Sequence, residues 1–375
     1  MQILVIHDRK ESCRNIIRGA VILKECYYKN FLKCFEVKQS YDKINYDYFF
    51  LLADEEDIIE KILEKLEKNG IHEEKILVYK IFKDKMCAQN DMMIIDEFLK
   101  SNEDVDAVIL GMSHAKDGIK TECFHEQIVN LAIPSIDLFY MKKLIGKLAK
   151  SGKLSGMRFI IIELPYYMFN WDISRSRKSF ERFEVLRYFG DFHHMEKEKV
   201  QSHIQNMQII ESLVQDAFLT KGNEPKKLRN QHLFFRILRS FYYDIICQDS
   251  DSEKKRQMKC QQRSNMWEKL HEETLLENEQ IWKELILLIR KENPQMQIYV
   301  TILPHNPIFF SAHSNFIKRM KRIFYEKVRV DDKLIILDSF NSLKRHEEYF
   351  KDDCHLNGFG AYMYTIFLKR LMRVC

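Results

Sequence analysis

Short, uninterrupted apolar runs recur along the chain from about residue 106, with helical patterns between them. The five clearest runs are residues 106–113, 127–133, 157–164, 298–303 and 333–339. Runs of this length are typical of strands that are buried on both faces of a parallel sheet. The pattern therefore predicts an α/β fold with helices on both faces of the sheet.

A smaller set of strand and helix signals precedes these runs. Residues 1–7 (MQILVIH), 46–53 and 75–82 predict strands, and residues 54–70 predict an amphipathic helix that ends at a glycine. We expect a small Rossmann-like α/β domain over residues 1–90. This segment has no G-x-G-x-x-G motif, and Gly19 is the single glycine among residues 1–20. Because a phosphate-binding loop needs glycines where its backbone approaches the ligand, we expect no bound cofactor. Nucleotide binding by residues 1–85 is the alternative, which a thermal shift with nucleotides would reveal.

A long segment separates the third and fourth of the five runs. It exceeds an ordinary crossover connection, which indicates a helical insertion at about 172–290 within a domain spanning 100–375. Residues 194–221, 226–247 and 266–291 predict helices, and residues 250–265 predict an exposed polar loop. The insertion is either a lid or substrate wall, or a subdomain for packing or for binding a partner.

Composition narrows the class of protein. The formal charge of +5 comes from 60 basic and 55 acidic residues, which gives no reason to expect nucleic acid. The nine cysteines are irregularly spaced with no C-x-x-C, so we expect neither a disulfide framework nor a metal site. Scattered thiols, the absence of a signal-peptide pattern and the absence of a membrane-length apolar stretch predict a cytoplasmic protein without a membrane span.

Two short motifs follow predicted strands and carry reactive side chains. Ser113 comes directly after the run at 106–113, in Gly111-Met112-Ser113-His114, where a hydroxyl can be presented above a sheet. Asp352 and His355 precede the apolar C-terminal pattern, at a spacing that brings a carboxylate to an imidazole. For each motif the alternative is helix capping, and His114 is interpreted as a helix-start residue rather than a base.

Taken together, the two motifs resemble the SGNH (GDSL-like) hydrolase family, over roughly residues 100–168 and 292–375. The resemblance implies a three-layer α/β/α sandwich with a five-stranded parallel sheet of the flavodoxin-like kind. It also implies a catalytic triad of Ser113, His355 and Asp352. The family's first block is G-D-S, and here Met112 replaces its aspartate.

The other two family blocks supply the oxyanion hole. For the second block, N-x-G-x-x-G, residues 130–135 lie at the equivalent place, so Ser135 would replace the last glycine through its backbone N–H, beside that of Ser113. For the third block, G-x-N-D, the run at 157–164 ends in Glu163-Leu164-Pro165 and offers no matching asparagine. One oxyanion donor is therefore lost or replaced.

The resulting expectation is a serine esterase, acyl hydrolase or O-acyltransferase, without metal or organic cofactor, acting on a small acyl ester and possibly on a glycan. The resemblance extends to a bacterial subgroup that has an N-terminal Rossmann-like segment and is linked with surface polysaccharides. Substrate contacts are expected from Tyr166, Tyr167, His305 and Asn306, which follow strands. For the two tyrosines the alternative is packing beneath the insertion. The alternative is a degenerate scaffold with a binding role in surface-glycan biosynthesis; protein partners are not predicted.

Overall fold

The computed structural model of the 375-residue chain describes residues 2–7, 21–34, 46–53, 56–176, 183–213, 269–344 and 346–372. These residues divide into two compact units. The described parts of 1–90 and 177–228 form the N-terminal unit. The described parts of 91–176 and 229–375 form the C-terminal unit.

The N-terminal unit contains a four-stranded parallel sheet in the order β2-β1-β3-β4. Its strands are β1 (Gln2–His7), β2 (Val21–Tyr27), β3 (Tyr48–Leu52) and β4 (Ile76–Val78). The helices are α1 (Tyr28–Cys34), α2 (Glu56–Lys68), the start of α3 (Tyr79–Lys100), α6 (Phe183–Tyr188) and α7 (Lys197–Leu213). Its core joins α2 to the strands, with Leu4, Phe31, Leu51 and Ile62 almost fully buried.

Two features of this unit differ from the sequence prediction. The strand predicted over 75–82 is wrong beyond residue 78, because Tyr79 begins α3. Buried Ala88, Met92, Ile95 and Phe98 recur every three or four positions along that helix, the period of an α-helix rather than of a strand. The strand β2 and the helix α1 were not predicted at all.

The C-terminal unit contains a five-stranded parallel sheet in the order β6-β5-β7-β8-β9. The strands are β5 (Ala107–Leu110), β6 (Ile128–Asn130), β7 (Phe159–Glu163), β8 (Gln297–Ile302) and β9 (Leu334–Asp338). All five predicted strands are present, and the α/β class is confirmed. The order reverses beside β5, so the carboxyl ends of β5 and β7 flank the switch point where such sheets place their sites.

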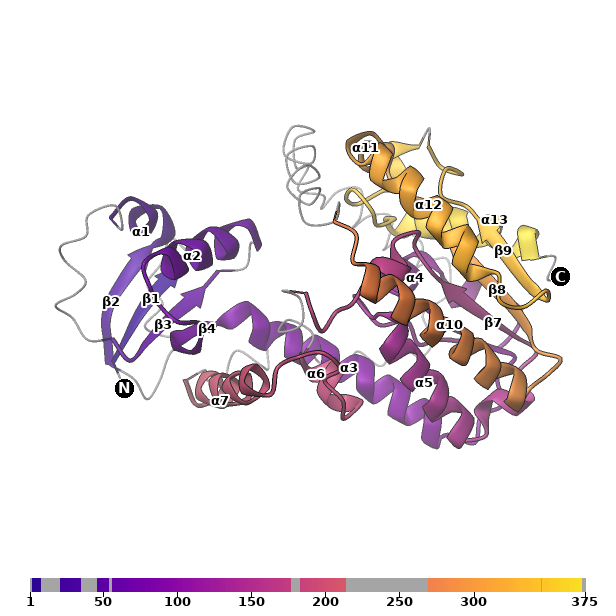
Figure 1. Ribbon diagram of the computed structural model, residues 1–375, viewed down its shortest axis with the longest axis horizontal. Helices are drawn as coiled ribbons and strands as arrows, with labels where there is room; N and C mark the ends of the chain where they lie inside the picture. The colour runs from indigo at the N-terminus through magenta and orange to yellow at the C-terminus, as the bar shows by residue number, and fades with distance from the viewer. Residues whose placement is uncertain are drawn as a thin grey trace. The chain divides into compact units, whose positions relative to one another are not determined.

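Helices cover both faces of this sheet. On one face, α4 (Ser113–Gly118) and α13 (Gly358–Met372) share a core with alternate strand residues such as Ile109, Ile161 and Leu337. On the other face, α10 (Glu272–Glu292) contacts both α5 (Leu138–Lys150) and α12 (Ser314–Val328), and the three helices lie in front of the strands in Figure 1. The three-layer α/β/α arrangement is therefore confirmed.

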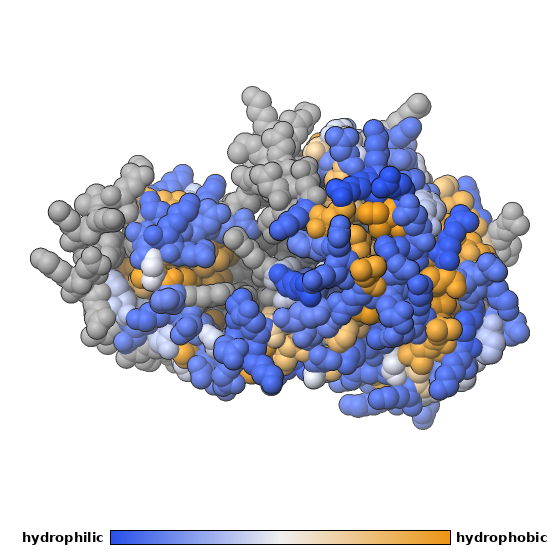
Figure 2. Space-filling model, viewed as in Figure 1, coloured by the Kyte–Doolittle hydropathy of each residue, from blue (hydrophilic) through white to orange (hydrophobic). Residues whose placement is uncertain are grey.

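The surface over α10 and α12 is mainly hydrophilic, with apolar patches between the charged side chains (Figure 2). Two leucines of α10, Leu276 and Leu287, are more than 60% exposed. No helix among the described residues is both long and apolar enough to cross a membrane.

The predicted helical insertion is described only in part. The predicted helix at 194–221 corresponds to α7 (Lys197–Leu213), and the one at 266–291 corresponds to α10 (Glu272–Glu292). The predicted helix at 226–247 and the predicted loop at 250–265 lie outside the described residues.

Candidate active site

Ser113 begins the helix α4, three residues beyond the end of the strand β5 and two beyond Gly111. Gly111 has φ +148°, a conformation that L side chains rarely adopt. A Cβ atom at Gly111 would also lie only 2.7 Å from Cβ of Glu163. The turn that presents Ser113 thus needs glycine for two independent reasons.

Asp352 and His355 lie in the loop between the 3₁₀ turn η7 (Glu347–Tyr349) and α13. Oδ1 of Asp352 accepts the backbone N–H groups of Cys354 at 2.9 Å and of His355 at 2.7 Å, so the carboxylate organises its own loop. The loop closes through Lys351 N–H to the carbonyl of His355, and Asn357 holds its far end by donating to the carbonyl of Glu348.

Ser113, His355 and Asp352 form one continuous chain of contacts, although Ser113 and His355 are 242 residues apart. Oγ of Ser113 lies 2.7 Å from Nε2 of His355. Nδ1 of His355 lies 2.9 and 3.0 Å from the two carboxylate oxygens of Asp352. A carboxylate only accepts, so Nδ1 carries the proton, and neutral Nε2 accepts the hydroxyl of Ser113.

The charge of Asp352 suits this tautomer. Partial burial raises its pKa, but hydrogen bonds from the ring and the backbone of His355, together with the Cys354 N–H, hold it well below the ordinary value. The carboxylate is therefore ionised throughout the neutral range and stabilises an imidazolium beside it. The site remains accessible, since the side chains of His355 and Asp352 are 20% and 40% exposed.

Ser135 lies in a tight turn, residues 133–136, that follows β6. Ser135 has φ +62°, and the N–H of Ile136 donates to the carbonyl of Ile133. These features are typical of a type II β-turn, in which proline is common at the second position and glycine is favoured at the third. The N–H of Ile133 donates to the carbonyl of Gly111, which ties this turn to the one that carries Ser113. The left-handed conformation is one that glycine adopts more readily than serine.

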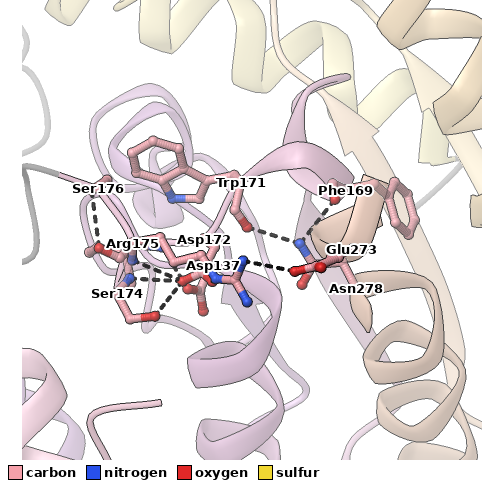
Figure 3. A network of polar contacts seen from close by, with 10 residues as sticks. Asp137, Phe169, Trp171, Asp172, Ser174, Arg175, Ser176, Glu273 and Asn278 are labelled. Carbon is pink, nitrogen blue, oxygen red and sulfur yellow. Dashed lines mark hydrogen bonds and ion pairs between the residues drawn. The ribbon is translucent and has the colours of Figure 1, made fainter. Parts of the chain in front are cut away.

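A network of polar contacts that includes Asp137, Trp171 and Asn278 (Figure 3) adjoins the Ser135 turn. The indole N–H of Trp171 donates to the carbonyl of Ser135, and Asp137 accepts the N–H groups of Tyr140 and Ile173 through its two oxygens. Burial raises the pKa of Asp137 to about 7, despite these N–H bonds. The segment carrying Trp171 is fixed in turn by Asn278 of α10, which donates to the carbonyls of residues 169 and 171.

Two residues that the sequence analysis did not place in the site flank the nucleophile. Glu163, fully buried at the end of β7, accepts the N–H of Met112 at 2.8 Å and lies 3.3 Å from Nδ1 of His114. The His114 ring is 5.0 Å from the His355 ring between centroids. Glu163 and His114 are 49 residues apart, so no short sequence motif contains both. The one signal in the sequence is that a charged residue, Glu163, ends an otherwise apolar strand.

The four predicted substrate contacts are all buried, and their polar atoms bond within the protein. The Tyr166 hydroxyl donates to Asp338 at 2.7 Å, and that of Tyr167 lies 4.0 Å from Sδ of Met112. His305 stacks on Phe340, and burial lowers its pKa well below the ordinary value. The side chain of Asn306 caps α11 (Pro307–Ala312) and donates to the carbonyl of Asp352 at 3.4 Å. These contacts support the walls of the site, and no bound molecule is needed to satisfy them.

Comparison with known proteins adds little to this geometry. No family model matches the chain, and no curated protein matches it. One similar solved structure, from Streptococcus pneumonia, is described as a candidate platelet activating factor. It is 12% identical with a TM-score of 0.39, and the match covers 83% of this chain and 98% of that chain. Similarity at this level supports no conclusion about function.

Proposed function

We propose that the C-terminal unit is a serine hydrolase that cleaves a small acyl ester, with a triad of Ser113, His355 and Asp352. The observation that carries the proposal is the chain of contacts from Ser113 Oγ to His355 Nε2 at 2.7 Å and from His355 Nδ1 to Asp352 at 2.9 Å. Capping of α4 by Ser113 does not account for this contact, because Met112 occupies the N-cap position and Ser113 is already the first residue of the helix.

In the proposed acylation step, Oγ of Ser113 attacks the ester carbonyl carbon while its proton passes to Nε2 of His355. The carbonyl π electrons move to oxygen, which becomes the oxyanion. As the intermediate collapses, the bond to the leaving alkoxide breaks and His355 returns the proton to it. Water, or an acceptor hydroxyl in a transferase, then attacks the acyl-serine by the same steps in reverse.

The oxyanion would be stabilised by the backbone N–H groups of Ser113 and Ser135. Ser113 is the first residue of α4, where N–H groups have no acceptor within the helix. The neighbouring N–H of Met112 is already bonded to Glu163. Two donors in place of three predict a slower enzyme, since each lost donor typically costs about 10²–10³ in turnover.

The proposed steps use side chains and backbone groups of this chain alone. The acyl group is expected to be small and the alcohol a carbohydrate, as the SGNH resemblance implies. Neither Cys123 nor Cys354 forms a disulfide, which is compatible with work in a reducing compartment such as the cytoplasm.

A binding scaffold is the second candidate, and Glu163 is the observation that favours it. The family resemblance leads one to expect an oxyanion donor at the end of β7, and this position holds a carboxylate that only accepts hydrogen bonds. A protein that retains the triad geometry but has lost a donor could bind an ester without turning it over.

Hydrolysis of 4-nitrophenyl acetate and of an O-acetylated sugar distinguishes the two candidates. The Ser113→Ala variant is expected to lose about 10³-fold or more of the activity. The matched control is Ser155→Ala, because Ser155 is exposed and its hydroxyl bonds only to the carbonyl of Gly152; it should match the wild type. A folded wild-type protein no faster than Ser113→Ala would favour the scaffold.

A further inference from the structure

The proposed reaction leaves one reactive side chain of the site unused. Cys354 lies between Asp352 and His355 in sequence, its side chain is buried, and Sγ lies 3.3 Å from Nδ1 of His355. The thiol thus approaches the imidazole on the edge opposite to Ser113, which contacts Nε2.

Further metal-binding side chains surround this thiol. Ligand atoms of His114, Cys354 and His355 all lie within 4.8 Å of one another. Cys354 also belongs to a second such group, with Asp352 and Asp353. The two groups share Cys354, and a carboxylate oxygen of Asp352 is 2.9 Å from Nδ1 of His355, so Asp352 adjoins the first group.

This donor set matches zinc in kind and number. Zinc takes four ligands from thiolate, imidazole and carboxylate groups, with neighbouring ligand atoms about 3.3–3.6 Å apart in a tetrahedron. The sulfur–nitrogen distance of 3.3 Å already meets this requirement. The ligand atom of His114 lies within 4.8 Å of the other two, so it needs a shift of at most about 1.5 Å to complete this edge of a tetrahedron. A thiolate and a carboxylate together cancel the two positive charges of the ion, so the occupied site carries no net charge.

We propose that Cys354, His355 and His114, with Asp352 as the fourth ligand, form a binding site for Zn²⁺ whose occupancy switches off the triad. Zinc on Nδ1 of His355 replaces the proton shared with Asp352 and opposes the imidazolium; zinc on Nε2 displaces Ser113. In both cases Ser113 loses its base. Binding itself is independent of catalysis, whereas the inhibition rests on the proposed function.

The first test measures binding with Cd²⁺, whose thiolate complexes absorb in the ultraviolet. Titration of the full chain, reduced with a phosphine, should give a thiolate band that saturates at one equivalent. The Cys354→Ser variant should lose this tightest equivalent. The control is Cys123→Ser in the same unit, because burial raises the pKa of Cys123 to about 11 and makes it a poor ligand. A band that persists in Cys354→Ser, or no band in the wild type, overturns the site.

The second test uses the wild-type protein and so does not depend on the folding of a variant. X-ray absorption at the zinc edge should show one sulfur at about 2.3 Å and nitrogen or oxygen ligands at about 2.0–2.2 Å. Two or more sulfur ligands would place the ion at other cysteines and contradict the proposal.

The third test measures ester hydrolysis with and without Zn²⁺, comparing each variant with itself. Saturating Zn²⁺ should slow the wild type and Cys123→Ser at least tenfold, reversibly with a chelator, and leave the rate of Cys354→Ser unchanged. Equal rates in zinc-loaded and zinc-free wild type would refute the switch. A chain that binds Cd²⁺ through Cys354 but never hydrolyses an ester would retain the site and refute the proposed function.

Discussion

The buried carboxylate of Glu163 offers a sharp test of how the nucleophile is positioned. Both of its oxygens are engaged, one by the N–H of Met112 at 2.8 Å and the other near Nδ1 of His114 at 3.3 Å. These partners immediately precede and follow Ser113. The Glu163→Gln variant has the same shape but no charge, and it can accept only one of the two hydrogen bonds.

The expected cost follows from these two bonds. Hydrogen bonds to charged groups contribute about 1.5–3 kcal/mol and neutral ones about 0.5–1.5 kcal/mol, so the bond that the amide keeps weakens by about 1 kcal/mol and the other loses about 1.5–3 kcal/mol. The amide is cheaper to bury than the carboxylate, which offsets part of this loss. We therefore expect the free energy of unfolding to fall by about 1–2 kcal/mol. If half of that reaches the Ser113 turn, ester hydrolysis slows by roughly two- to fivefold.

Urea unfolding gives the change in the free energy of unfolding, and an ester hydrolysis assay on the same preparations gives the change in rate. The matched control is Glu284→Gln on α10, whose carboxylate pairs with Lys142 at the exposed surface and should change stability by less than about 1 kcal/mol. If Glu163→Gln unfolds and hydrolyses ester just as Glu284→Gln does, Glu163 does not position the nucleophile.

Three further predictions concern the surrounding turns. Gly111→Ala should lower the free energy of unfolding by about 3 kcal/mol or more, because φ is positive at this position and the added Cβ would collide with Glu163. The control is Gly146→Ala in the middle of α5, where the added Cβ has open space. This variant should raise the free energy of unfolding by about 0.5–1 kcal/mol in the same urea unfolding assay. Ser135→Gly relieves a positive φ and keeps the N–H, so hydrolysis should persist with equal or higher stability; a large loss of activity would show that the Ser135 side chain takes part. The raised pKa of Asp137, about 7, means that the folded state keeps a proton that the unfolded chain releases from about pH 4 upward. The wild type should therefore lose stability relative to Asp137→Asn between about pH 4 and 7, by about 4 kcal/mol at most, and then level off. Denaturant unfolding of both proteins at pH 5 and pH 8 checks this, and a difference that does not change with pH would contradict it.

The strands and the approximate places of the reactive residues were predictable because each depends on local sequence. A strand buried on both faces must be apolar throughout, so the runs around Ile109, Ile161 and Val300 stand out without further information. The polar residue that ends a strand is also visible, and the sheet order then brings the ends of β5 and β7 together.

Contacts between distant residues were not predictable in the same way. The sequence shows Glu163 only as a position where the family's asparagine is missing. Its role could not be predicted, because its partner Met112 is 51 residues away. Tyr166 was assigned to the substrate, whereas its hydroxyl bonds to Asp338, 172 residues further along the chain. A metal site at Cys354 was not predictable, because sequence motifs for zinc have ligands at short, regular spacings. His114, which lies near the thiol in the structure, is far from it in the sequence.

The central claim is that His355 activates Ser113, and reaction with a fluorophosphonate tests it most directly. Peptide mapping of the labelled wild-type protein should place the adduct on Ser113. The label should be absent from Ser113→Ala and fall sharply in His355→Ala, with both variants folded by circular dichroism. A folded wild-type protein that is not labelled, or that is labelled equally well without the His355 imidazole, would contradict the account.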